Sequence, residues 1–253
     1  MTHSRRIALA TLAAPLALAL AACNGDAEGT DDAASLDGEP IADVAAPDGQ
    51  VWSETVQVTE KGGYLLGNPD APLKLVEYGS LTCGACANFA QTGAEQLKSE
   101  YVDSGVVSFE LRNLSRDAFD TTLNALVRCG SDESFHPLSD QVWLNWESVM
   151  NNAQQGSQQL QSLDVPEGDM FVAIAQVAGM FDFFAARGLS RDQAASCLAD
   201  ASAVEALGRE LNAQADADNV SRTPTFILNG QTLQETSWPQ LEGVLQRAGA
   251  RDE

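Results

Sequence analysis

The stretch VEYGSLTCGACANF, residues 76–89, decides the fold predicted for this chain. A strand-like apolar run leads into it, a helix-like run leaves it, and Cys83 and Cys86 lie at the junction. With Thr82 as N-cap, Cys83 takes the first helical position, and Cys86 follows about one turn later on the same face, close enough to bridge. A helix start presents free backbone N–H groups and the positive end of the helix dipole, which both favour an anion. The pattern therefore predicts a redox-active dithiol, with Cys83 exposed and activated as a thiolate and Cys86 recessed.

Other uses of two closely spaced cysteines fit this sequence less well. Haem attachment needs histidine directly after the second cysteine, and position 87 is alanine. A zinc site needs a second close ligand pair, whereas Cys129 and Cys197 are isolated in the sequence, so zinc stays only as a minor alternative and no metal is expected. A purely structural disulfide between adjacent helical turns would close a very short loop and stabilise little.

A second motif, RTPTFILNG at residues 222–230, lies about 140 residues after the first. Together with Glu77, six residues before the first cysteine, the two motifs resemble the thioredoxin superfamily, specifically its DsbA-like branch of exported thiol-disulfide oxidoreductases. The likeness runs from about Gly67 to the C-terminus. The dipeptide between the cysteines, Gly84-Ala85, lacks the histidine found in the most oxidising members of that branch.

The resemblance implies a role for each motif residue. Cys83 is the nucleophile that joins a substrate cysteine in a mixed disulfide, and Cys86 resolves it. Glu77 would be a buried carboxylate that exchanges a proton with Cys86; the alternative is a surface carboxylate on a strand edge. Pro224 would be a cis proline packed over the dithiol, which leaves the backbone of Thr223 extended and free to pair with a bound peptide; the alternative is an ordinary trans proline. No cofactor is implied.

Periodicity predicts the elements around the two motifs. A buried strand at residues 73–78, a helix at 83–102 and a strand at 106–114 form a βαβ unit with parallel strands. Near the C-terminus, a hairpin with the turn Asn229-Gly230 and a last helix beginning after Ser237 close the fold as ββα. Between them, residues 117–219 read as about five helices without strands. The predicted class is therefore α/β: a thioredoxin fold at residues 51–253 with an inserted all-helical domain.

Two further cysteines, Cys129 and Cys197, lie in separate helices of this insertion. In an oxidising compartment they are expected to form a second, structural disulfide, with two free buried thiols as the alternative. The aromatic residues Trp143, Trp146, Phe181 and Phe183 lie at helical spacings, which favours core packing over the lining of a substrate groove. No chemistry is assigned to His136.

The N-terminus reads as an export signal. Residues 1–22 contain two arginines and a long apolar run, and their last three residues form the lipobox sequence LAAC together with Cys23. The resemblance to bacterial lipoprotein signals implies cleavage before Cys23 and acylation of its sulfur; an ordinary signal peptide is the alternative. The expected location is the periplasmic face of a bacterial membrane. Residues 23–50 carry no lysine or arginine and few large apolar side chains, so we expect a disordered acidic tether.

The formal net charge is −22, which makes nucleic acid and anionic membrane surfaces poor partners. The expected function is that of a monomeric, membrane-tethered thiol-disulfide oxidoreductase, acting as an oxidase on exported proteins with cysteine thiols and recharged by a membrane oxidase. A reductase or isomerase would use the same dithiol. A metal-binding or chaperone-like lipoprotein on the same scaffold is the alternative from another functional class.

Overall fold

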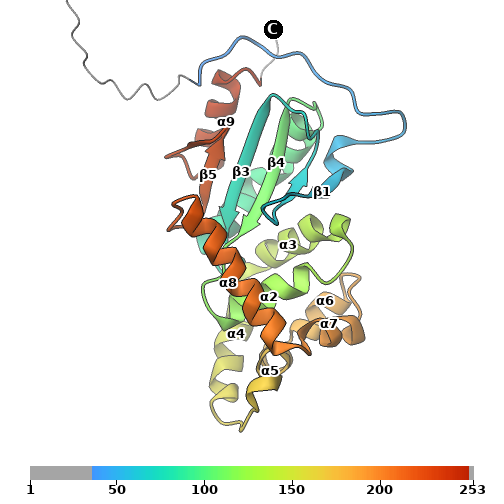
Figure 1. Cartoon of the computed structure of the whole chain (residues 1–253), viewed down its shortest axis with the longest axis vertical. Helices are drawn as coiled ribbons and strands as arrows, with labels where there is room; N and C mark the ends of the chain where they lie inside the picture. Colours follow the sequence, from blue (N-terminus) through green and yellow to red (C-terminus); the bar gives the residue numbers. More distant parts are fainter. Residues whose placement is uncertain (1–35, 251–253) are drawn as a thin grey trace, which may run out of the picture. The chain divides into compact units, whose positions relative to one another are not determined.

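The computed structural model describes residues 36–250 of the chain. At its centre is a six-stranded sheet with the strand order β1-β2-β4-β3-β5-β6 (Figure 1). The strands are β1 (Val56–Val58), β2 (Tyr64–Leu66), β3 (Leu73–Gly79), β4 (Val107–Asn113), β5 (Thr225–Leu228) and β6 (Gln231–Thr232). β3 and β4 are parallel, as the βαβ prediction requires, and the other neighbours are antiparallel.

Strand β3 lies between β4 and β5; the face that carries Leu73, Leu75 and Glu77 is buried, whereas the other face runs from the exposed Lys74 to the buried Tyr78. Successive side chains of a strand point to opposite faces. Tyr78 therefore faces a small cluster with Val220 and Ile227, whereas Leu75 faces the main core. Glu77 shares the face of Leu75, so its carboxyl group points into the larger core.

Two helices cover that face. The first is α1 (Gly84–Phe89), which continues with wider, π-helical turns at Ala90–Ala94 and Leu97–Val102 instead of the uniform helix expected at 83–102. The second is α9 (Trp238–Arg247). The ring of Trp238 contacts the rings of Phe89 and Tyr101, at centroid distances of 6.3 and 5.6 Å. Its side chain lies where a Cβ on Gly93 would be, so only glycine permits this close approach.

The helical insertion lies between β4 and β5, at one end of the sheet (Figure 1). It contains α2 (Ala118–Val127), α3 (Phe135–Leu144), α4 (Trp146–Leu160), α5 (Met170–Val177), α6 (Met180–Ala185), α7 (Arg191–Leu198) and α8 (Ala201–Ala217). Seven α-helices replace the expected five, because single residues separate α3 from α4 and short breaks such as that at Gly179, with a positive φ of 67°, interrupt the apolar periodicity. A capping box of Ser190 and Gln193 begins α7, and the Asp200 side chain caps α8 by accepting the Ala203 N–H.

Residues 36–50 differ from the expected disordered tether. They form no helix or strand, but their backbone is hydrogen-bonded to the folded domain: Ile41 N–H donates to Gly249 over 2.9 Å, and Val44 N–H donates to Ser104 over 2.7 Å. Trp52, in a 3-10 turn (Trp52–Glu54), donates its indole N–H to the Val44 carbonyl. The amino-acid composition of this segment did not predict these contacts. Most of its side chains are small or polar, and only a few of its residues make the contacts.

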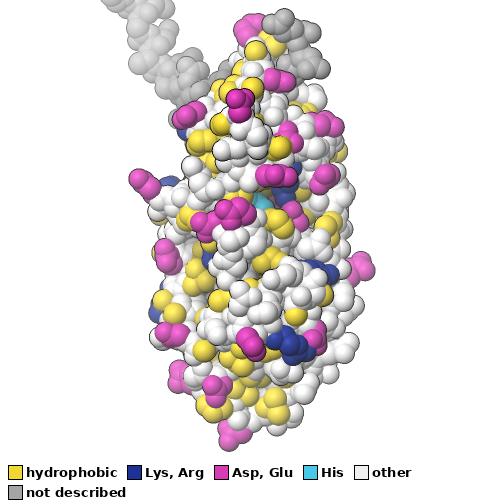
Figure 2. Space-filling view, turned by 90° about the vertical axis from the view of Figure 1, so that its right-hand side faces the viewer, with side chains coloured by type: hydrophobic (Ala, Val, Ile, Leu, Met, Phe, Trp, Pro, Cys, Tyr) yellow, Lys and Arg dark blue, Asp and Glu magenta, His cyan; other side chains and the backbone are white. Residues whose placement is uncertain are grey.

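The predicted signal and Cys23 lie outside the described residues. Among helices of residues 36–250, none combines the length and apolar character needed to cross a membrane. Acidic side chains are scattered over the face seen in Figure 2, with fewer basic ones among them.

Candidate active site

Cys83 lies where the carboxyl end of β3 meets the start of α1. Its backbone is extended, with φ of −85° and ψ of 119°, and its carbonyl accepts the first helical hydrogen bond, from Ala87 N–H over 3.0 Å. Cys83 is thus itself the N-cap, and the prediction that Thr82 caps the helix was wrong by one residue. The sulfur still stands at the helix start, where backbone N–H groups have no helical acceptor.

The βαβ half and the ββα half of the fold meet at this sulfur. The Cys83 thiol lies 3.4 Å from the carbonyl oxygen of Thr223, in the loop before β5. The peptide bond between Thr223 and the buried Pro224 is cis, as the resemblance implied. The expectation of an exposed Cys83 was wrong: Cys83 is buried, with 7% of its surface accessible, and Cys86 is fully buried, and both thiols are reduced.

The surroundings lower the pKa of Cys83 to about 5. The largest cause is the hydrogen bond from the Cys86 thiol; burial opposes it, and the Thr223 side chain and the backbone N–H groups of Cys86 and Ala85 add to it. Each of these donors stabilises a thiolate more than a thiol. Cys83 is therefore ionised at neutral pH.

Cys86 shows the opposite behaviour. Burial raises its pKa well above the usual value for a thiol, and its hydrogen bond to Cys83 and the charge of Glu77 act in the same direction. The pair thus consists of one acidic sulfur at the edge of the site and one sulfur that keeps its proton. The lower pKa makes Cys83 a better leaving group than Cys86, and this difference gives disulfide exchange a preferred direction.

Glu77 is a core residue and not an edge residue. Its side chain is fully buried, and neither carboxyl oxygen has a hydrogen-bond partner among the described residues. Burial is the main reason why its pKa rises to about 8, and the charge of Asp140 raises it further, whereas that of Lys98 lowers it. Glu77 is therefore mostly protonated at neutral pH and can release a proton close to it.

Lys98, in the π-helical turn Leu97–Val102, forms an ion pair with Asp140 on α3. His136 lies one turn before Asp140 on α3, with its Nε2 2.9 Å from the Tyr64 carbonyl oxygen. Burial and the charge of Lys98 lower the pKa of His136 to about 3, so the ring is neutral.

Two residues of the insertion hold the loop before Cys83, and the sequence did not point to them. The carboxylate of Asp120 on α2 accepts the Ser80 hydroxyl over 2.7 Å, and Trp143 on α3 donates its indole N–H to the Ser80 carbonyl over 3.0 Å. Both side chains are buried. No sequence pattern links these residues to the loop, because they lie 40 and 63 positions away from Ser80.

The four aromatic residues divide between core and site. Trp143 and Phe181 are buried in the core, and Phe183 packs under the guanidinium group of Arg187. Trp146, by contrast, lies beside the dithiol: its Cζ2 atom is 3.2 Å from the position that a Cβ on Gly84 would take. It also lines an open cavity of about 630 Å³ formed by one face of α1 and the junction of α3 and α4.

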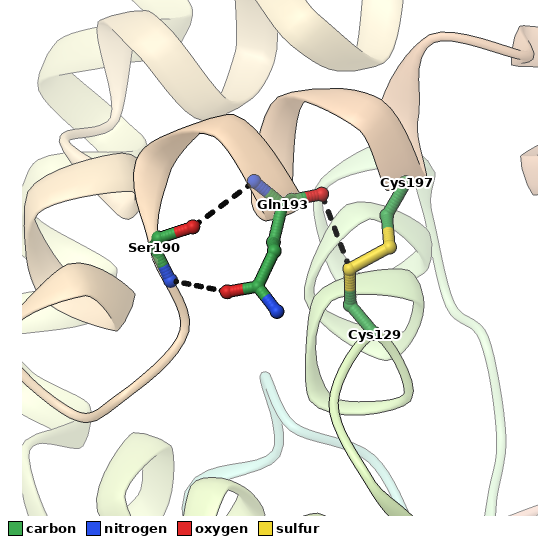
Figure 3. Close-up of a disulfide and its surroundings, with 4 residues drawn as sticks. All are labelled: Cys129, Ser190, Gln193 and Cys197. Carbon is green, nitrogen blue, oxygen red and sulfur yellow. Dashed lines mark hydrogen bonds between the residues drawn. A yellow bond between two sulfur atoms is a disulfide. The ribbon is translucent and has the colours of Figure 1, made fainter.

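Cys129 and Cys197 form a disulfide that joins the end of α2 to α7, with a Cα–Cα distance of 6.0 Å (Figure 3). Cys129 Sγ lies 3.3 Å from the Gln193 carbonyl oxygen, which is a contact without a donor proton, because an oxidised sulfur carries none. The capping box of Ser190 and Gln193 fixes the start of the same helix. Within residues 36–250, no group of three or more histidine, cysteine or acidic side chains could hold a metal ion.

Comparison with known proteins agrees with this geometry. Residues 59–247 match the family described as thioredoxin. A crystal structure of a protein-disulfide isomerase from Novosphingobium aromaticivorans is 32% identical, covers 73% of this chain and 96% of its own, and superposes with a TM-score of 0.63. A Rickettsia bellii protein named "Putative protein-disulfide oxidoreductase" is 24% identical over 80% of this chain and 70% of its own length.

The crystal structure of alpha-DsbA1 from Wolbachia pipientis shares the fold, with a TM-score of 0.55 at 18% identity over 76% of this chain and 93% of its own. The family match spans most of the described residues and includes both cysteines of the dithiol and Pro224. The chain therefore belongs to the thioredoxin family, as a thiol-disulfide oxidoreductase whose fold, with a helical insertion between β4 and β5, is DsbA-like.

Proposed function

We propose that this thiol-disulfide oxidoreductase acts as an oxidase, which passes the disulfide of Cys83 and Cys86 to cysteine pairs of exported proteins. One observation carries the proposal: the pKa of Cys83 is lowered to about 5, while that of its neighbour Cys86 is raised. A thiolate that is stable at neutral pH stabilises the reduced enzyme, and a stable reduced form makes the oxidised form a strong donor of disulfides.

The proposed reaction has two exchanges. A client thiolate attacks the sulfur of Cys83, the bond between Cys83 and Cys86 breaks, and a mixed disulfide with the client forms. A second client thiolate then attacks the client sulfur of that mixed disulfide, and Cys83 leaves as a thiolate. The client loses two electrons and gains a disulfide, and the enzyme gains two electrons as a dithiol.

Glu77 is the proposed proton donor in the first exchange. Cys86 leaves as a thiolate in a buried environment that strongly favours the thiol, so it must be protonated there. Glu77 carries a proton at neutral pH, since its pKa is about 8, and its charge affects Cys86. The return of a proton to Glu77 would complete the cycle.

We further propose that a lipid on Cys23 holds the enzyme at the periplasmic face of a bacterial membrane and that a quinone-linked membrane oxidase regenerates the disulfide. The lipobox LAAC supports the anchor. For client segments, the proposed docking position is the open cavity beside Trp146, because it adjoins the first residue after Cys83.

Isomerisation of disulfides is the second candidate. The relative from Novosphingobium aromaticivorans, at 32% identity, is named a protein-disulfide isomerase, and this favours the same activity here. An isomerase starts from the reduced dithiol: the Cys83 thiolate attacks a wrong client disulfide and is later displaced by another client thiol. A low Cys83 pKa favours isomerisation as well as oxidation. The reduction potential of the dithiol is therefore the property that distinguishes the two candidate functions.

Equilibration with glutathione tests the direction. An oxidase should have a reduction potential well above the roughly −270 mV of thioredoxin, and a value near that of thioredoxin would contradict the proposal. The activity assays should agree: the oxidised enzyme should oxidise a reduced, unfolded client, and the reduced enzyme should be poor at reactivating a scrambled one. The variant Cys83→Ser should lose both activities, whereas Cys86→Ser should accumulate the mixed disulfide.

A further inference from the structure

We propose that Asp120 is a positioning residue for the redox site: it sets the acidity of Cys83 by holding Ser80, although it contacts neither sulfur. The feature is a fully buried carboxylate on the helical insertion, which reaches back to the loop between β3 and α1. This inference rests on the proposed redox role of Cys83, but its readout is the titration of that thiol and needs no client.

The carboxylate of Asp120 binds mainly the active-site loop. Oδ2 accepts the Ser80 hydroxyl over 2.7 Å and the Arg116 N–H over 3.1 Å, and Oδ1 accepts the Leu81 N–H over 3.1 Å. Helix α2 does not need this group as its cap, because the Asp117 side chain already accepts the Asp120 N–H over 2.8 Å. Two of its three donors therefore belong to the loop that carries Cys83.

Ser80 transmits the constraint to the first cysteine. Its hydroxyl has a single proton and donates it to Asp120, so it is left as an acceptor for the Thr82 N–H over 3.2 Å. Its carbonyl accepts the Cys83 N–H over 3.1 Å and, from the other side, the indole N–H of Trp143 over 3.0 Å. The turn from Ser80 to Cys83 is thus held between α2 and α3.

Ser80 also touches the second cysteine. A hydrogen bond from its backbone to Cys86 lowers the pKa of that thiol against the larger effect of burial. The low pKa of Cys83 depends in turn on donors at fixed positions, namely the Cys86 thiol and the N–H groups of Cys86 and Ala85. A shift of the Ser80 turn would move Cys83 relative to all of these donors at once.

The burial of a charge at this position supports a specific role. Burial raises the pKa of Asp120 to about 6, so the fold keeps a carboxylate where desolvation disfavours it. The variant Asp120→Asn has almost the same shape but only one acceptor oxygen. If that oxygen serves Ser80 and Arg116, the amide NH₂ must face the Leu81 N–H, and that hydrogen bond is lost.

The test measures the Cys83 pKa by thiolate absorbance against pH. In Asp120→Asn we expect it to rise by about one unit, with an approximately tenfold weaker oxidising equilibrium against glutathione. Ser80→Ala should produce a similar rise. The double variant should add little to either single change, because both remove the same contact.

Asp117→Asn is the matched control. It removes a carboxylate charge from the same helix start without touching Ser80, and asparagine is also a good N-cap, so the Cys83 pKa should stay unchanged. A Cys83 pKa within about 0.3 unit of the wild type in folded Asp120→Asn and Ser80→Ala would overturn the inference. If Asp120→Asn does not fold, Ser80→Ala decides alone. An ordinary Cys83 pKa in the wild type would instead contradict the proposed function.

Discussion

The thiol of Cys83 lies 3.4 Å from the carbonyl oxygen of Thr223, although 140 residues separate the two in the sequence. One residue belongs to the βαβ half of the thioredoxin fold and the other to the ββα half. The site is thus complete only when β3 and β5 have paired across the helical insertion.

The acidity of Cys83 leads to a first prediction. Thiolate absorbance of the reduced protein should show a step near pH 5, and Cys83→Ser should abolish it. Because the Cys86 thiol is the largest cause of the low pKa, Cys86→Ala should raise the Cys83 pKa more than Cys86→Ser, whose hydroxyl still donates. Equal shifts in the two variants would contradict the assigned cause.

The same shift predicts how pH affects stability. Between pH 5 and about 8.5, Cys83 is ionised in the folded reduced protein but protonated in the unfolded chain. The free energy of unfolding of the reduced form should therefore rise with pH across this range and fall as the pH drops towards 5. In the oxidised form Cys83 carries no titrating thiol and makes no such contribution. The Tm of the reduced form should therefore rise relative to that of the oxidised form as the pH increases across the same range.

Glu77 should have the opposite effect. Its pKa is raised to about 8 in the folded protein and lies near 4.5 in an unperturbed chain, so the folded state holds an extra proton between these values. Its contribution to the free energy of unfolding then decreases as the pH rises. Relative to the wild type, Glu77→Gln should gain roughly 3 kcal/mol between pH 5 and pH 7.5, measured by denaturant titration of the oxidised form.

A charge variant controls this measurement. Lys98 lowers the pKa of Glu77, so Lys98→Met should move the titration of Glu77 to higher pH. Because Lys98 also pairs with Asp140, this shift is read as the difference in pH dependence between wild type and Glu77→Gln, compared with and without Lys98→Met. A parallel pH dependence in wild type and Glu77→Gln would show that this carboxyl group titrates normally.

The disulfide of Cys129 and Cys197 should stabilise the insertion without taking part in exchange. It spans a sequence separation of 68 residues, for which chain entropy gives a contribution of about 4 kcal/mol. The double variant Cys129→Ala/Cys197→Ala should lose stability of that order under non-reducing denaturation and keep the Cys83 pKa. Alkylation of both residues in the native wild-type protein would contradict the bridge.

The contact between Gly84 and Trp146 predicts a local steric effect. A Cβ at position 84 would lie 3.2 Å from Cζ2 of Trp146, so Gly84→Val should cost roughly 1–3 kcal/mol of stability. Ala85→Val is the matched control, because Ala85 is exposed one position later. Trp146→Ala in the Gly84→Val background should recover part of the loss, and the absence of any recovery would rule out the proposed clash.

The core elements were predictable because their signals are local. Alternating apolar residues mark β3 and β4, the Asn229-Gly230 turn marks the last hairpin, and two cysteines at a strand-to-helix junction mark the site. The helix boundaries were less accurate. Cys83 and not Thr82 caps α1, since a cap depends on a backbone angle that neighbouring residue types do not determine.

The sequence by itself determined the dithiol, the order of strands and helices and the presence of the helical insertion, because periodicity and motif spacing record which residues share a face of one element. Only the tertiary structure decided that Glu77 is fully buried, that Asp120 and Trp143 hold Ser80, and that Trp146 lies over Gly84. These contacts join residues that are far apart in the chain. Packing between elements brings them together, and the pattern within any single element carries no record of its neighbours.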